Sequence, residues 1–119
     1  MSDITLYGLS ASTCDTMKKA CKWLENNGNS YSLHNYRVEG LTLEQLTIFE
    51  ASIGWETLVN KRSTTYRQLS DAQKKGLNKE SAITLMLEQP TLIKRPLLSY
   101  QGNYYVGFKA DQYNSIFNG

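Results

Sequence analysis

The feature that most constrains the fold is a strand–loop–helix–strand pattern within the first 36 residues. Residues 4–7 form an apolar, β-prone segment that Gly8 interrupts, and a run of small polar residues follows. From about Cys14 to Asn27, apolar residues recur at helical spacing, and Gly28 is expected to supply a left-handed C-cap. Residues 31–36 have the composition of a second strand. A helical connection of this length joins parallel strands in a right-handed crossover. The pattern therefore predicts the start of an α/β sheet.

This pattern delivers a cysteine to the first turn of the predicted helix. Ser12 or Thr13 is expected to act as N-cap there, accepting a backbone N–H that the helix start leaves unpaired. Free N–H groups and the positive end of the helix dipole both favour a thiolate, which is the nucleophilic form of cysteine. Cys14 is therefore a candidate nucleophile. The alternative is that it is a small buried hydrophobic residue.

The second cysteine is predicted to be a core residue rather than a nucleophile. Cys21 lies on the apolar stripe of the helix with Met17 and Leu24, which indicates a core residue. Seven residues of helix separate it from Cys14 by roughly 10 Å, too far for a disulfide. His34, the single histidine, has no evident partner for a role as a base.

Composition excludes several classes of function. A chain of 119 residues with a net charge of +2 and no basic run predicts one domain, residues 1–119, that does not bind nucleic acid. No apolar stretch is long enough for a membrane span, and no signal-peptide pattern is present. Two cysteines are too few for a disulfide framework, which favours a reducing, cytoplasmic setting. One histidine and two distant cysteines predict no metal site.

The middle of the chain changes to helical character, and the last third returns to strands. A capping box at residues 42–45 opens a helical insert at about 41–89, with further caps at Ser70 and Asn78. A strand at 97–100, a turn, a return strand at 104–108 and a helix at 111–117 follow. The order β-α-β, helices, β-β-α predicts an α/β, thioredoxin-like fold with a four-stranded mixed sheet and a helical insertion.

Three segments in this order carry a family resemblance. They are Cys14 at the strand–helix junction, Asn60-Lys-Arg-Ser-Thr-Thr-Tyr66, and Ile93-Lys-Arg-Pro-Leu97. The chain resembles the arsenate-reductase-like (ArsC) family from Ile4 to Phe117. The segments Leu6-Tyr-Gly8, Cys14-Asp-Thr16, Tyr36-Arg-Val38 and Gly54-Trp55 are most similar to its YffB/Spx-type branch.

The resemblance implies roles for particular residues. Cys14 would be the nucleophile, with Arg62, Arg95, Thr13 and Pro96 contributing to substrate binding or thiolate stabilisation. Guanidinium groups suit this task because they stay charged and bind oxyanions or carboxylates bidentately. The resemblance also implies a cis Arg95–Pro96 peptide bond that faces an extended peptide ligand such as glutathione.

Two departures from the family pattern narrow the range of functions that we expect for this chain. Arsenate reductases of this family carry a third arginine after the final hairpin, where this chain has only Lys109, and the Spx regulators carry a second cysteine at the position of Met17. We therefore expect a thiol oxidoreductase that binds no cofactor and uses glutathione as co-substrate through a mixed disulfide. Arsenate reduction is a sub-option. The alternative is a non-catalytic, Spx-like module that binds a protein partner.

Overall fold

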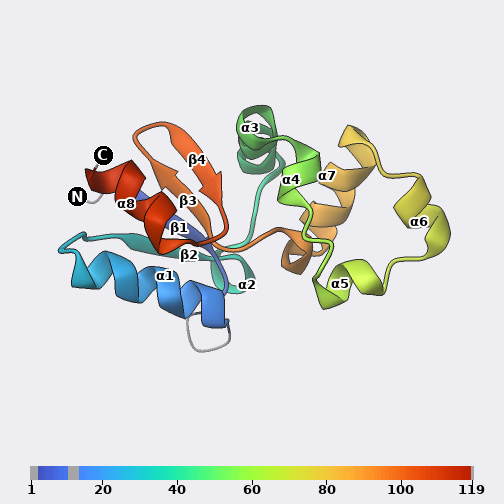
Figure 1. Cartoon of the computed structure of the whole chain (residues 1–119). Helices are drawn as coiled ribbons and strands as arrows, with labels where there is room; N and C mark the ends of the chain where they lie inside the picture. The colour runs from blue at the N-terminus through green and yellow to red at the C-terminus, as the bar shows by residue number, and fades with distance from the viewer. Residues whose placement is uncertain (1–2, 11–13, 119) are drawn as a thin grey trace. The chain divides into compact units, whose positions relative to one another are not determined.

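A computed structural model describes residues 3–10 and 14–118 of the chain. These residues group into two compact units, one comprising 1–38 with 95–119 and the other 39–94 (Figure 1). The second unit contains the helical insert predicted at 41–89. Whether the chain behaves as one domain over residues 1–119 stays a prediction.

The first unit is built on a four-stranded mixed sheet with the strand order β2-β1-β3-β4. Strand β1 (Ile4–Gly8) pairs in parallel with β2 (Ser32–Asn35) and antiparallel with β3 (Leu97–Tyr100), which pairs antiparallel with β4 (Asn103–Val106). The predicted fold class and the parallel crossover are therefore confirmed. The pairing brings the carboxyl end of β1 and the amino end of β3 to the same edge of the sheet.

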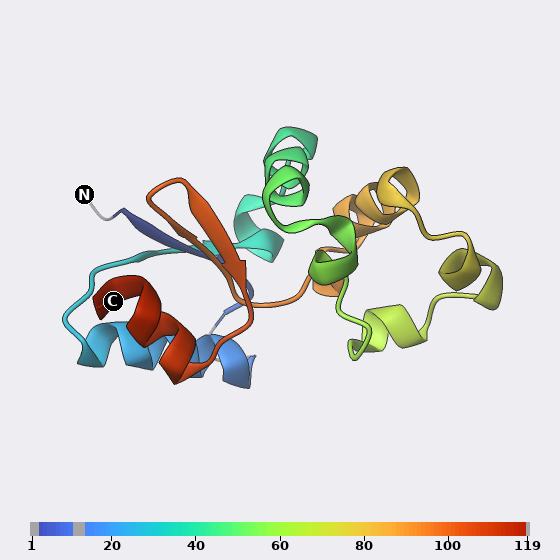
Figure 2. The same cartoon turned by 45° about the horizontal axis from the view of Figure 1, so that its top comes forward.

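Two helices, α1 (Asp15–Asn26) and α8 (Ala110–Asn118), lie side by side along this sheet (Figures 1 and 2). They pack together through Trp23 of α1, whose ring lies edge-to-face with Tyr113 of α8 at a centroid distance of 5.6 Å and tilted against Phe117 at 5.8 Å. The core of the unit combines apolar side chains of both helices with those of β1 and β3: Ile4, Leu6, Met17, Ala20, Cys21, Leu24, Leu98 and Tyr113.

The turns explain where these elements end. Helix α1 ends in a Schellman motif, because Gly28 adopts a left-handed φ of 72° and the N–H groups of Gly28 and Asn29 donate to the carbonyls of Glu25 and Leu24. The hairpin between β3 and β4 turns at Gln101 and Gly102, whose φ values of 50° and 80° are typical of a type I′ turn. The predicted glycine cap and hairpin are thus confirmed.

Two strand boundaries differ from the sequence prediction. Strand β2 stops at Asn35, because the Asn35 side chain accepts a hydrogen bond from the Arg37 N–H (2.9 Å) and starts the short helix α2 (Tyr36–Glu39). Strand β4 stops at Val106 rather than residue 108, because Gly107 adopts a φ of 80°.

The second unit is helical. It comprises α3 (Leu43–Ile53), α4 (Trp55–Leu58), α5 (Thr64–Arg67), α6 (Asp71–Lys75), α7 (Lys79–Glu88) and a 3₁₀ turn at Pro90–Leu92. Capping boxes begin α3, α6 and α7 at Thr42, Ser70 and Asn78, as predicted. Leu43 does not join the buried face of α3, since it is 58% exposed. None of the described helices combines the length and apolar character that a membrane crossing requires.

Candidate functional site

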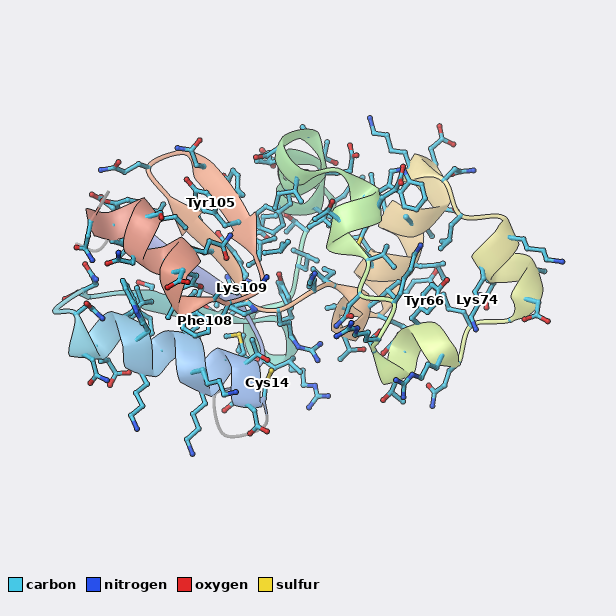
Figure 3. The ribbon with its side chains drawn as sticks, in the orientation of Figure 1. Cys14, Tyr66, Lys74, Tyr105, Phe108 and Lys109 are labelled. Atoms are coloured by element: carbon cyan, nitrogen blue, oxygen red, sulfur yellow. The ribbon has the colours of Figure 1, made fainter. Side chains whose placement is uncertain are left out.

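Cys14 is the N-cap residue of α1 rather than a residue of its first turn, where the sequence placed it (Figure 3). It has extended backbone angles, and its carbonyl accepts the N–H of Lys18 (3.0 Å). Its thiol is partly exposed and makes no capping hydrogen bond. The thiol therefore lies beside the unpaired N–H groups of a twelve-residue helix and remains accessible.

This position corrects the predicted capping by Ser12 or Thr13. An N-cap at Cys14 places both residues before the cap, because the first helical residue is Asp15. Thr13, which the sequence assigned to the site, and Ser12 themselves lie outside the described residues. The carboxylate of Asp15 is exposed in the first turn of α1.

The Arg95–Pro96 peptide bond is cis, as the resemblance implied. Pro96 is buried, and its carbonyl accepts the N–H of Gly107 (2.9 Å), which extends the pairing of β3 with β4 by one step. Leu97, the next residue, pairs with Tyr7 of β1. Arg95 and Pro96 therefore lie at the edge of the sheet from which the chain runs on to Cys14.

Gly8 connects this edge to helix α1. A Cβ atom placed on Gly8 would lie 2.7 Å from the Met17 sulfur and 3.5 Å from Cγ of Arg95. Met17 is fully buried and stands one helical turn after Cys14. The aliphatic part of Arg95 thus packs at the end of β1, next to the helix that carries the candidate nucleophile.

Arg62 belongs to the second unit. It is exposed in the turn before α5, and its backbone N–H donates to the side chain of Asn60 (3.0 Å). The structure therefore places Cys14, Arg95 and Pro96 in one unit and Arg62 in the other. The predicted association of Arg62 with Cys14 stays a prediction.

Arg62 lines a pocket of about 490 Å³ within the second unit. Lys61 and Lys94 line the same pocket, together with the single carboxylate of Glu56. The pocket is held by an antiparallel bridge between Val59 and Ile93 and by two flanking backbone hydrogen bonds, from Asn60 N–H to the Leu92 carbonyl and from Lys94 N–H to the Leu58 carbonyl. Three cations against one anion make this pocket suited to an anionic group.

The sequence analysis missed the two lysines of this pocket. The signal was present, because each predicted arginine directly follows a lysine, in Lys61-Arg62 and in Lys94-Arg95. What the sequence did not reveal is the Val59–Ile93 bridge that brings the two segments together.

The structure also places three other residues that the sequence singled out, His34, Cys21 and Lys109. His34 lies in an aromatic cluster, with ring-centroid distances of 4.8 Å to Tyr7 and 5.9 Å to Tyr36. Cys21 is 6% exposed, which confirms its prediction as a core residue. Lys109 is exposed at the start of α8, where its carbonyl accepts the Tyr113 N–H (3.0 Å). Within residues 3–10 and 14–118, no three side chains of histidine, cysteine, aspartate or glutamate gather in a way suited to a metal ion.

Comparison with known proteins shows the family of this chain and supports the fold described above. The sequence pattern of the ArsC family matches residues 9–116. This chain belongs to the ArsC family. A solved YffB protein, 46% identical, superimposes with a TM-score of 0.88 over 94% of this chain and 96% of its own. The thioredoxin-like fold with its mixed four-stranded sheet is thereby established.

Two curated relatives extend the ArsC comparison. An uncharacterized protein from Haemophilus influenzae is 46% identical over 114 residues, covering 96% of this chain and 98% of the relative. The global transcriptional regulator Spx from Lactiplantibacillus plantarum is 26% identical over 112 residues, covering 92% of this chain and 82% of the regulator. The ArsC-family chain is thus similar both to YffB-type proteins and to a family of regulators.

Proposed function

We propose that this ArsC-family chain is a glutathione-dependent thiol reductase with Cys14 as its single nucleophile. The observation that carries the proposal is the contrast between its two thiols. Cys14 is accessible at the N-terminus of α1, whereas Cys21 is buried in the core. In general, the unpaired N–H groups at a helix N-terminus favour the thiolate, which is the nucleophilic form of cysteine. With Met17 one turn further on, Cys14 has no cysteine neighbour to resolve a mixed disulfide, so an external thiol must do so.

The cycle balances with glutathione alone as reductant. The Cys14 thiolate attacks the glutathionyl sulfur of a mixed disulfide, a Cys14–glutathione disulfide forms, and the other thiol leaves and takes a proton from water. A second glutathione thiolate then attacks the glutathionyl sulfur bound to Cys14. Oxidised glutathione leaves, and the Cys14 thiolate is restored. In the net reaction, the mixed disulfide and one glutathione become a free thiol and oxidised glutathione, so the sulfur of the released thiol gains one electron and the sulfur of the incoming glutathione loses one.

The charges around the candidate residues favour a substrate that carries carboxylates. Glutathione has two carboxylates, and the pocket at Arg62 combines this arginine with Lys61 and Lys94. Arg95 adds a guanidinium at the edge of the sheet before Pro96. Guanidinium groups bind carboxylates in a bidentate manner, which lysines do not. We therefore assign Arg62 and Arg95 to substrate binding.

Steady-state turnover tests this proposal. The reduced protein is assayed with glutathione and the mixed disulfide of glutathione and cysteamine, with oxidised glutathione measured by a coupled reductase. A parallel assay replaces the disulfide with arsenate. We expect turnover of the disulfide and one glutathionyl group on Cys14 by mass spectrometry. Turnover of arsenate alone would reassign the chain as an arsenate reductase, despite the missing third arginine.

A non-catalytic regulatory module is the second candidate, favoured by the identity to the Spx regulator. This module would bind a protein partner and would not need a reactive thiol. Absence of turnover in both assays, with no glutathionyl adduct on Cys14, would select it over the reductase. The chain has Met17 rather than a second cysteine, so such a module would lack a two-cysteine switch.

A further inference from the structure

The pocket at Arg62 in the second unit holds charges of both signs that do not neutralise one another. Its charged lining residues are the cations Lys61, Arg62 and Lys94 and the acid Glu56, and all four are exposed. Within the part of the chain that the structure describes, none of these four forms an ion pair. The pocket therefore presents positive charge and negative charge separately to a ligand.

The backbone fixes the places from which these side chains start. The Asn60 side chain accepts the N–H of Arg62 (3.0 Å), and the Asn60 carbonyl accepts the N–H (3.1 Å) and the hydroxyl (2.7 Å) of Ser63. Residues 60–63 thus form a closed turn. The N–H of Lys94 donates to a carbonyl of the facing segment at 2.7 Å. Both cations of the turn and the lysine opposite it therefore have well-anchored backbones at the rim of one pocket.

The mixture of charges restricts the chemistry of a ligand. Glu56 repels a simple dianion, and the three cations repel a simple cation. An α-amino acid group carries a carboxylate, which suits the planar fork of a guanidinium, and an ammonium, which donates hydrogen bonds to a carboxylate. Glutathione carries two carboxylates and one ammonium at neutral pH, the reverse of the three cations and one acid of the pocket. The pocket volume of about 490 Å³ is in the usual range for small molecules.

We propose that this pocket binds the γ-glutamyl end of glutathione, with Arg62 holding its α-carboxylate and Glu56 accepting hydrogen bonds from its α-ammonium. Lys61 and Lys94 add the positive charge that attracts the second carboxylate. The proposal rests on the proposed function and deepens it. It makes Glu56 the residue that distinguishes an amino-acid end from a dianion of the same length.

Equilibrium binding tests the role of Glu56 without any thiol chemistry. The probes are S-methylglutathione and its glutaryl analogue, in which hydrogen replaces the α-ammonium, titrated calorimetrically into the whole chain. We expect S-methylglutathione to bind about twofold to fivefold more tightly, as for an exposed ion pair. Glu56→Gln should weaken binding of S-methylglutathione and strengthen binding of the analogue. A preference that Glu56→Gln leaves unchanged, or no preference in the parent chain, would overturn the proposal.

Opposite changes for the two probes also guard against a trivial cause. A variant that folds poorly would lose affinity for both probes alike, so it cannot produce the expected reversal. Glu44→Gln is the matched control, because Glu44 is an exposed acid of the same unit that does not line this pocket. It should leave both affinities unchanged. A reversal in Glu44→Gln as large as in Glu56→Gln would show that the net charge of the chain, rather than the pocket, selects the ligand.

The cations have their own test. Arg62→Gln should weaken binding of both probes about tenfold, because both keep the α-carboxylate. Lys94→Gln should weaken both about twofold to fivefold, and added salt should reduce this effect. Lys75→Gln, which changes an exposed lysine outside the pocket, should have no effect. Equal losses in Lys75→Gln and Lys94→Gln would contradict binding in this pocket.

Binding and turnover separate the failure of this proposal from the failure of the proposed function. A Glu56-dependent preference in a chain without turnover would support the γ-glutamyl site and reject the reductase. Turnover in a chain that binds S-methylglutathione and the glutaryl analogue equally would support the reductase and reject the γ-glutamyl site.

Discussion

The two cysteines lie on the same helix, yet the structure gives them opposite surroundings. Cys14 caps the N-terminus of α1 and is partly exposed, whereas Cys21 is 6% exposed within the core of the first unit. Near Cys14, the neighbouring edge of the sheet carries the cation Arg95. Around Cys21, the interacting groups are phenols: burial, the Cys21 thiol and Glu25 raise the pKa of Tyr31, and burial with Cys21 raises that of Tyr113.

This difference teaches that position on the helix, rather than residue type, separates the candidate nucleophile from the core cysteine. At the N-terminus, unpaired N–H groups and the helix dipole favour a negative sulfur. Within the helix, the backbone N–H groups are already hydrogen-bonded to carbonyls and cannot stabilise a thiolate. Glu25 adds a negative charge near the Tyr31 hydroxyl, which donates to it at 2.8 Å. Cys21 therefore lies among apolar and aromatic side chains of the core.

The largest effect that this difference predicts concerns variants in which one of the two thiols is removed. Cys14→Ser is expected to lower kcat/KM of the proposed reductase by about a thousandfold, because the step that forms the mixed disulfide loses its nucleophile. Cys21→Ala should retain turnover within about threefold, with a stability loss of roughly 1 kcal/mol for the smaller buried side chain. Steady-state assays and urea unfolding measure the two effects. Equal losses of turnover in both variants would break the comparison.

A second prediction gives Cys14 the partner that it lacks. Met17 is at the third helical position after the N-cap, where the two side chains approach each other. In Met17→Cys, we expect oxidised glutathione to yield an intrachain disulfide between positions 14 and 17 in place of the glutathionyl adduct. Mass spectrometry distinguishes the two products.

Stability provides the control for this variant. The shorter side chain leaves a cavity where Met17 is fully buried, so a loss of about 1–3 kcal/mol is expected. Persistence of the glutathionyl adduct in a folded variant would show that the side chain at position 17 does not reach Cys14.

A third prediction concerns the glycine beneath this end of the helix. Gly8→Ala is expected to destabilise the chain by about 1–3 kcal/mol, because the new methyl group would meet the fully buried Met17 sulfur at 2.7 Å. In the double variant Gly8→Ala/Met17→Ala, the methyl group has room, so the two losses should not add. Additive losses in urea unfolding would show that Gly8 does not contact Met17.

Local patterns made much of the fold predictable. The capping residues Thr42, Ser70 and Asn78, together with Gly28, begin or end their helices as predicted, since each acts on backbone groups within four residues. The boundary at Asn35 was missed, because its side chain competes with the strand for a backbone N–H.

The candidate site was predictable only in part. The strand–loop–helix pattern does place Cys14 after β1 and at the start of α1, but it does not reveal which residues neighbour one another across strands. Gly8 was interpreted only as a break in the strand, because its closeness to Arg95 depends on how β1 pairs with β3. In the same way, Lys61 and Lys94 come together only through the Val59–Ile93 bridge. Such contacts join residues that are far apart in the sequence, and they form only when the chain folds.

The smallest expected effect appears only in alkali, where two buried tyrosines of the first unit, Tyr36 and Tyr113, ionise. Tyr36 and Tyr113 have pKa values raised above the ordinary 10.0, with burial as the main cause in both. Between pH 10 and the raised pKa, the unfolded chain loses protons that the folded chain retains. Stability is therefore unaffected below about pH 10 and should fall above it by at most about 1.4 kcal/mol per pH unit for each tyrosine.

Phenylalanine variants assign this loss to its sources. Tyr36→Phe removes the contribution of the tyrosine that stacks on Tyr7, and Tyr113→Phe removes that of the tyrosine near Cys21, while both variants keep an aromatic ring in place. Each variant should unfold in urea with a shallower dependence on pH between 10 and 11 than the parent chain, and the two reductions should add, because the tyrosines contact different groups. A variant with the slope of the parent would show that its tyrosine ionises alike in the folded and unfolded chains.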